Sequence, residues 1–313
     1  MKKLIVLLLA FAMVGAVSAQ VTTAIGLYGE VTLVDQAGQG VFTDYGNGSD
    51  TLTFKATDKD GKYGFAATYN NVLAANLGGV RDWNVWGKML GGKLSVGNLR
   101  DATFRLTLPY WAGATIFGGT DRVSGQGVFY VSNAMNGLTF GVNLPYALVA
   151  GDTLDILQNA DLGVKYDAKG VGTVFALMNL DLVAPAANVL NAGFKFTGMK
   201  ALTATLIAQA KFDANTYKAG LGFAYTGVDK LTANLEAAFT STAGVSAYSV
   251  WAQGAYAVTD LVTATVGGSY ANTGYDAYGA VAYSLGSGFS VEGKVGFNSA
   301  LYATAKLYYG VSF

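Results

Sequence analysis

The most constraining feature of this sequence is an alternation of apolar and polar residues that repeats through most of the chain after residue 20. In the stretch 216–226, tyrosine, alanine, leucine and phenylalanine occupy every second position, and lysine, glycine and alanine lie between them. Residues 231–240 repeat the pattern, and in residues 201–212 only Ile207 breaks it. Successive side chains of a β-strand point to opposite faces, so each stretch presents one apolar and one polar face. The sequence therefore predicts an all-β fold.

The alternation predicts eighteen strands, separated by short turns rich in Gly, Asn and Asp. We expect them near residues 22–34, 50–58, 62–70, 82–89, 93–99, 126–131, 138–145, 160–167, 171–181, 189–197, 201–212, 216–226, 230–241, 247–258, 261–270, 276–285, 289–298 and 301–313. Many of these segments have about the 9–11 residues that a tilted strand needs to cross a bilayer.

Two architectures can produce such alternation, a β-sandwich and a membrane-spanning barrel. A sandwich packs large branched side chains inward, but here the apolar face mixes Leu, Val and Phe with many Ala and Gly. Tyrosines such as Tyr217 and Tyr225 bound the apolar stripes, as in the aromatic girdles of outer-membrane barrels. The polar face has few side chains large enough to fill a core, whereas a barrel of more than a dozen strands holds water. The sequence favours a transmembrane antiparallel up-and-down β-barrel over a secreted soluble β-domain.

Residues 1–19 have the pattern of a secretory signal peptide. Lys2 and Lys3 precede an apolar run from Leu4 to Val17, and small residues end the segment at Ala19. The run is too short for a spanning helix, which needs about 20 residues. We therefore expect cleavage before Gln20 and one domain, the barrel, over residues 20–313. Basic and acidic residues balance at 20 each, so nothing indicates a nucleic-acid partner.

The composition argues against catalysis. The chain has no His and no Cys, which removes the commonest general base, the commonest metal ligand and every thiol nucleophile. No glycine-rich phosphate loop leads into a helical pattern, and no complete calcium loop is present. We expect no enzyme activity, no metal and no cofactor.

Several segments resemble the Gram-negative bacterial general porins. The final stripe, which ends at Phe313, resembles the C-terminal assembly signal of outer-membrane barrels, and residues 60–65 resemble the second hairpin of the porins. Residues 91–97 resemble the strand before the inward-folded third loop, and residues 128–141 the hairpin after it. The resemblance implies an outer-membrane location and a trimeric, water-filled channel for passive diffusion of small hydrophilic solutes and ions. It also implies 16 strands, so we expect 16–18.

The resemblance further implies that residues 100–125 fold into the barrel and narrow it. All four arginines of the chain lie between positions 81 and 122. Opposed charges at a constriction would sort solutes by charge and dipole. The alternative is an ordinary extra hairpin formed by Ala102–Leu108 and Ala112–Gly119. The candidate constriction residues are Arg100, Asp101, Arg105, Asp121 and Arg122.

The alternation also predicts which charged side chains face the lumen. The candidates on the wall are Lys55, Lys88, Lys165, Lys195, Lys211, Lys218, Glu236, Glu292, Lys294 and Lys306, together with Glu30 and Asp161. Lysines outnumber acids in this set, which predicts a weak preference for anions.

Two other functions remain open. A surface barrel could bind a host or partner through its loops and transport little. A substrate-specific sugar channel would need an aromatic track in the lumen, for which the candidates are Trp86, Phe175, Trp251, Tyr302 and Tyr308.

Overall fold

The computed structural model describes residues 21–34, 43–44, 51–70, 79–108, 122–145, 159–181, 187–272 and 274–312. The expected signal peptide, Asp121 and the segment Ala112–Gly119 lie outside these residues. Within the described ranges the regular structure is almost entirely β-strand. None of these residues belongs to a helix long and apolar enough to cross a membrane.

The described chain forms eighteen long strands and one two-residue strand, β2. The bounds are β1 Val21–Val34, β2 Thr43–Asp44, β3 Thr51–Asp58, β4 Tyr63–Asn70, β5 Val80–Met89, β6 Gly92–Asp101, β7 Val123–Ser132, β8 Leu138–Pro145, β9 Asn159–Ala168, β10 Gly172–Asp181, β11 Val189–Met199, β12 Leu202–Lys211, β13 Thr216–Val228, β14 Leu231–Thr242, β15 Val245–Ala257, β16 Val262–Ala271, β17 Gly274–Gly286, β18 Phe289–Phe297 and β19 Leu301–Ser312. Each predicted strand corresponds to one long strand, and among the described strands only β2 was not predicted.

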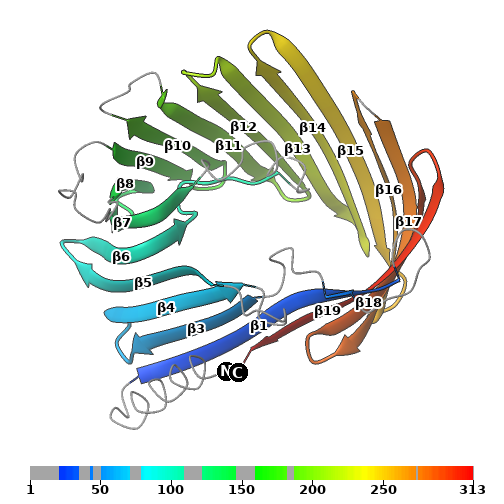
Figure 1. The fold of residues 1–313 in the computed structure, drawn as a ribbon, viewed down its shortest axis with the longest axis horizontal. Helices are drawn as coiled ribbons and strands as arrows, with labels where there is room; N and C mark the ends of the chain where they lie inside the picture. Colours follow the sequence, from blue (N-terminus) through cyan, green and yellow to red (C-terminus); the bar gives the residue numbers. More distant parts are fainter. Residues whose placement is uncertain are drawn as a thin grey trace.

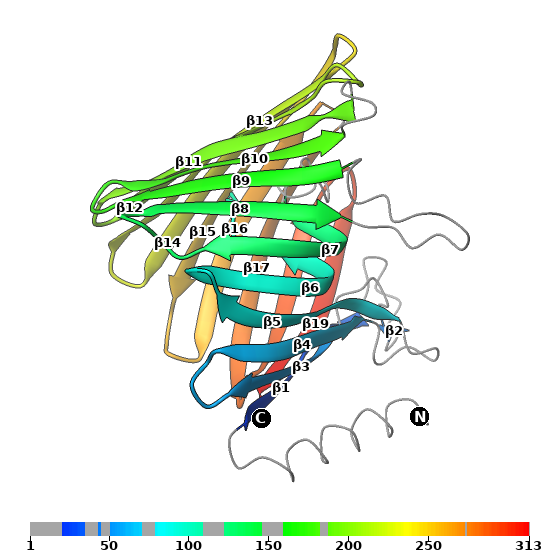
Figure 2. The same cartoon turned by 90° about the vertical axis from the view of Figure 1, so that its left-hand side faces the viewer.

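The strands close into a ring (Figure 1). Each long strand pairs antiparallel with its neighbours in the sequence, and β1 completes the ring by pairing with β19. Gly26 lies opposite Ser312 and Tyr28 opposite Gly310 at this closure. Figure 2 shows the strands side by side around the wall. The strands β13 and β17 have 13 residues each, whereas β3 and β4 have 8. The fold is thus the predicted antiparallel barrel, and its eighteen long strands lie within the expected 16–18, above the 16 that the porin resemblance implies.

Turn residues with left-handed backbones connect several hairpins. Asn136 and Gly137 have φ angles of 52° and 88° between β7 and β8. This conformation suits tight hairpins and favours Asn and Gly, the pair that the sequence supplies.

The two faces of the wall differ as the alternation predicts. Leu221 and Leu235 are 39% and 45% exposed on the outer face, so they do not interlock in a globular core. Tyr248 and Tyr270 stack beside each other on the outside of β15 and β16, with ring centroids 6.1 Å apart, and Tyr217, Tyr225 and Tyr256 are also exposed. An apolar outer band bounded by tyrosines is what lipid contact requires.

Candidate functional site inside the barrel

The chain turns inward where β6 ends. Asp101 begins this turn, because its Oδ1 accepts a hydrogen bond of 2.8 Å from the Thr103 backbone N–H. The Arg105 N–H then donates to the Ala102 carbonyl at 3.2 Å. Residues 102–108 form no strand, and Figure 1 shows them crossing the ring from the β6–β7 side toward β12 and β13. We call residues 102–108 the inward segment. The alternative of a hairpin strand over Ala102–Leu108 is therefore wrong.

Phe104 attaches the inward segment to the wall formed by β7, β8 and β9. Its side chain is only 2% exposed and packs edge-on against Phe129, with ring centroids 6.3 Å apart. Gly141 and Gly163 lie directly opposite each other in the β8–β9 pairing. A Cβ atom on either glycine would collide with the Phe104 ring. The paired glycines therefore form a socket that the phenyl ring fills.

Leu108 makes the second attachment, on the wall formed by β12 and β13. A Cβ atom on Gly220 would lie 2.6 Å from Leu108 Cδ1. Ile207, the residue that breaks the alternation of β12, is buried in the same apolar cluster as Leu108. The break in the pattern thus marks the place where an apolar residue faces inward to receive the inward segment. The whole cluster comprises Leu99, Phe104, Leu108, Val123, Phe129, Phe175, Leu177 and Ile207.

A ladder of polar side chains crosses five strands of the inner wall near this cluster. Asn143 and Asn179 each donate from Nδ2 to Asp161, at 2.7 Å in both cases. Gln209 Nε2 donates to Asn191 Oδ1 at 2.7 Å, and Asn191 Nδ2 reaches Asn179 Oδ1 at 3.4 Å. Asn143, Asp161, Asn191 and Gln209 are buried, so these hydrogen bonds replace contacts with water. We call this set the polar ladder.

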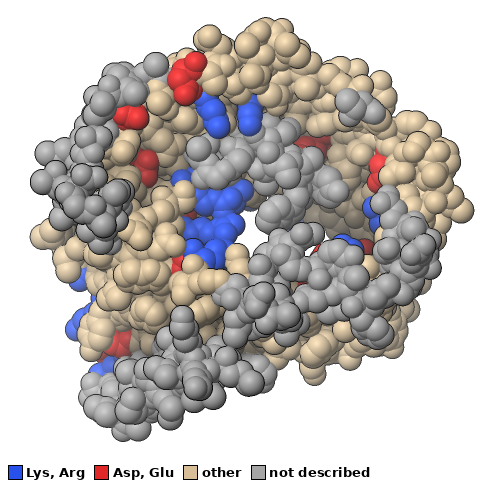
Figure 3. All heavy atoms as spheres, in the orientation of Figure 1, with Lys and Arg blue, Asp and Glu red and all other residues tan. Residues whose placement is uncertain are grey.

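The described candidate constriction residues lie near the start of the inward segment: Arg100 and Asp101 end β6, Arg105 belongs to the inward segment and Arg122 precedes β7. Arg100 lies opposite Ser124, on the face of β6 away from the buried Leu99 and Val123, so its side chain does not start from the inner face. Arg81, Arg105 and Arg122 lie close enough to Arg100 for their charges to act on it, as does Asp82. Figure 3 shows basic side chains inside the ring on the side of β6 to β9. Arg122 also lines a cavity of about 300 Å³ with Asp161, Asn179 and Asp181. The structure thus brings all four arginines together, whereas the side chain of Asp101 is engaged in the turn.

The strand register puts the candidate wall residues on one face of the sheet. Gly141 and Gly163 face inward, and residues directly opposite each other in neighbouring strands lie on the same face of the sheet. Traced from these glycines around the ring, the inner face includes Lys165, Lys195, Lys218 and Lys294. The remaining members of the set share this face: Lys55, Lys88, Lys211, Glu236, Glu292 and Lys306. Glu236 differs from the expectation of a water-facing charge, because it is only 1% exposed.

The inner face also carries several charges that the alternation did not predict. Asp82, Asp167, Asp181 and Asp276 share the face, as does Lys93. Asp167 and Asp276 pair with Lys165 and Lys294 at 3.1 and 3.8 Å. Both lie near strand ends, beside residues typical of turns. The alternation of inward and outward side chains nevertheless places both of them on the inner face. These acids offset the lysine excess on which the predicted anion preference rested.

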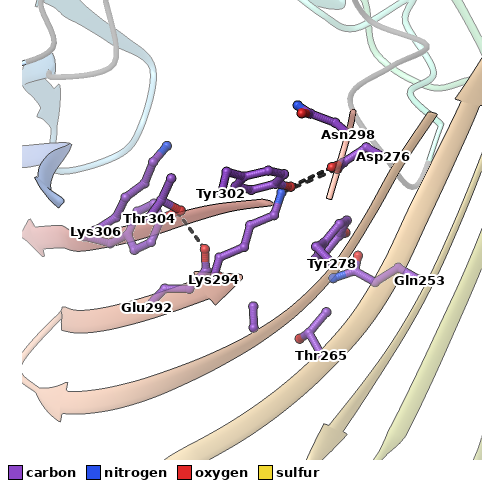
Figure 4. Close-up of a pocket in the computed structure, with 12 residues that line it drawn as sticks. Gln253, Thr265, Asp276, Tyr278, Glu292, Lys294, Asn298, Tyr302, Thr304 and Lys306 are labelled. Atoms are coloured by element: carbon purple, nitrogen blue, oxygen red, sulfur yellow. Dashed lines mark hydrogen bonds and ion pairs between the residues drawn. The ribbon is translucent and has the colours of Figure 1, made fainter. Parts of the chain in front are cut away.

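A second cavity, of about 570 Å³, lies on the inner wall of β15 to β19, where Figure 4 shows its lining side chains. Lys306 Nζ donates to Glu30 Oε1 at 3.1 Å beside it, and the Tyr308 hydroxyl donates to Glu292 at 3.4 Å. We call this cavity the wall pocket. Among the described residues, no group of three or more His, Cys, Asp or Glu is placed to hold a metal ion.

Comparisons with known proteins show likeness at the level of the fold. No protein-family model matches the chain, and no curated protein matches it in sequence. The outer-membrane protein OpdK of Pseudomonas aeruginosa superposes with a TM-score of 0.59 at 12% identity, covering 94% of this chain and 99% of that chain. OccAB4 of Acinetobacter baumannii gives a TM-score of 0.56 at 11% identity over 95% and 99% of the two chains. A mutant of the porin of Rh. blastica gives 0.55 at 14% identity over 93% and 100%.

Proposed function

We propose that this chain forms a water-filled channel in the bacterial outer membrane, through which small hydrophilic solutes and ions diffuse passively. The observation that carries the proposal is the closed ring with exposed apolar residues outside and charged residues inside. Such a ring satisfies every strand edge in lipid and encloses a polar interior. The inward segment would narrow the passage, because it crosses the ring between Phe104 on β7 to β9 and Leu108 on β12 and β13. The likeness to outer-membrane proteins supports the same membrane.

The test is single-channel recording of the refolded mature chain in a planar lipid bilayer. We expect discrete conductance steps in KCl that grow in proportion to the salt concentration, as for a water-filled pore. Heat-modifiable mobility on an SDS gel would report the folded barrel independently. A protein that shows this mobility yet passes no current would contradict the proposed function.

We further propose a weak preference for anions, carried mainly by Arg105 and Arg122 beside the inward segment, since Arg81 forms an ion pair with Asp82 and Arg100 lies on the face of β6 away from Leu99. The wall lysines support it less than the sequence suggested, since Lys165, Lys294 and Lys306 each have a carboxylate partner. A cluster of like charges near a narrow passage raises the local concentration of counter-ions. The zero-current potential across a KCl gradient should therefore have the sign of chloride selectivity. The opposite sign would refute this part of the proposal.

The aromatic track of a sugar channel has little support. Phe175 belongs to the apolar cluster, and Trp251 and Tyr302 are also buried, with only 3% and 7% of their surface exposed. Trp86 and Tyr308 are left as the partly exposed candidates. Two separated rings do not make a continuous stacking surface, so general diffusion is the better proposal.

The remaining expectations stay as predictions. The loops that a surface-binding barrel would use fall largely outside the described residues, so general diffusion is preferred to adhesion only because of the charged inner face. A homotrimer is testable by cross-linking the native protein in detergent. Removal of the signal peptide is testable by N-terminal sequencing, which should begin at Gln20.

A further inference from the structure

The wall pocket owes its space to small side chains. Thr265, Ala280 and Thr304 lie on the inner faces of β16, β17 and β19, where neighbouring positions carry long charged or aromatic residues. The result is a recess of about 570 Å³ that faces the lumen. A recess of this size accommodates a small solute, because ligand sites commonly begin at about 300 Å³.

The charges that line the wall pocket are balanced in sign and paired. Asp276 lies 3.8 Å from Lys294, and Glu292 is the direct cross-strand partner of Lys306. Lys306 in turn contacts Glu30 at 3.1 Å. A simple anion or a simple cation therefore meets both signs of charge here and gains little net attraction. A solute that carries both signs can oppose each lining charge with its opposite.

The tyrosines of the wall pocket are already engaged. Lys294 Nζ lies 3.9 Å from the ring centroid of Tyr278 and 5.3 Å from that of Tyr302 (Figure 4). The Tyr302 hydroxyl donates to Asp276 at 2.7 Å. The ammonium group thus occupies aromatic surface that a sugar or a flat ring would need for stacking. These contacts also hold Lys294 in place, so the charge pattern is fixed before a solute arrives.

We infer that the wall pocket is a low-affinity binding site for small dipolar solutes. Such solutes carry an ammonium and a carboxylate a few ångströms apart, as free amino acids do. The carboxylate of the solute lies toward Lys294 and Lys306, and its ammonium lies toward Glu292 and Asp276. Charge-assisted hydrogen bonds of this kind are the strong ones available to a small polar solute. The inference rests on the proposed channel function and names a solute class that the channel would retain.

The experiment uses the refolded channel in a planar bilayer at about 0.1 M KCl, where the screening length is about 10 Å. Glycine is titrated as the dipolar probe, and glycolamide, of similar size but without charges, is the neutral comparison. We expect glycine to reduce the conductance and raise the open-channel noise in a saturable way, and glycolamide to produce only a linear viscosity effect. Equal effects of the two solutes would overturn the inference. Replacement of chloride by acetate tests the purely anionic alternative, and block by acetate as strong as that by glycine would also overturn it.

Two variants locate the effect. Glu292→Gln and Lys306→Gln each remove one lining charge, and each should weaken half-maximal block by glycine about fivefold, as expected for a partly exposed pair worth up to about 1 kcal/mol. Lys165→Gln is the matched control, since it breaks a similar pair, with Asp167 at 3.1 Å, away from the wall pocket. Block weakened equally by all three variants, or by none, would refute the site. Absence of any conductance would instead refute the proposed function, so the two failures are distinguishable.

Discussion

Phe104 lies edge-on to Phe129, with ring centroids 6.3 Å apart and ring planes at 78°, and it thereby joins the inward segment to the inner face of β7. The ring also fills the space above Gly141 and Gly163, where any side chain would collide with it. The two glycines, which pair across neighbouring strands, thus leave room for the ring of one phenylalanine that is distant in the sequence. Interiors packed this closely are sensitive to the addition of a single carbon atom.

Replacing either socket glycine by alanine should therefore displace Phe104. We expect Gly141→Ala and Gly163→Ala to lower the free energy of unfolding by about 1–3 kcal/mol, the usual cost of overpacking. We also expect the single conductance level to split into several, because a displaced inward segment has no fixed position. Single-channel recording and urea unfolding in detergent micelles measure the two effects.

Gly26→Ala is the matched control for the glycine variants. Gly26 lies on the inner face of β1, and a Cβ atom there would meet its nearest neighbours at 3.8 Å or more. This variant should leave both conductance and stability unchanged. A socket variant with the same single, steady conductance level as the Gly26 variant would contradict the role of Phe104.

Asp161 is the acceptor that joins Asn143 and Asn179 in the polar ladder. In Asp161→Asn one of the two donors would face another N–H group, and the charge that strengthens both bonds would be lost. Hydrogen bonds to charged groups contribute about 1.5–3 kcal/mol, so we expect a loss of that order in the urea-unfolding free energy. Asp167→Asn, which breaks an exposed pair with Lys165, should cost less than about 1 kcal/mol. Equal costs at the two positions would show that the ladder adds no stability.

The strands were predictable because their cause is local. Each long strand follows the period of two, and the predicted 138–145, 216–226 and 289–298 differ from the observed strands by no more than two residues at either end. The attachment of the inward segment has another cause, the fit between Phe104 and two glycines in distant strands. In the sequence, this attachment was indicated by Ile207, an apolar residue at a position that faces inward. The polar ladder left no such trace, since Asn and Gln are ordinary lumen residues.

Arg122 lines the cavity beside the polar ladder with two carboxylates, and it is one of the four clustered arginines. Arg122→Gln should shift the zero-current potential in a KCl gradient toward cation selectivity. The shift in the permeability ratio should stay below about fivefold, since a unit charge in water acts with about 1 kcal/mol at 4 Å. Lys169→Gln, in the exposed turn after β9, is the control and should shift the potential less. If both variants shifted the potential equally, the total charge of the protein, and not the arginine cluster, would determine the ion selectivity.

Leu235 and Asn234 are neighbours on β14 that face opposite sides of the wall. Leu235 lies opposite Phe223 on the outer face and is 45% exposed, so in a membrane it contacts lipid chains. Leu235→Arg should destabilise the barrel by about 2–4 kcal/mol, the cost of a cation near the middle of a bilayer. Asn234→Arg puts the same side chain into the aqueous interior and should change stability by no more than about 0.5 kcal/mol. Urea unfolding in lipid vesicles measures both variants, and a reversed order would mean that the apolar stripe does not face lipid.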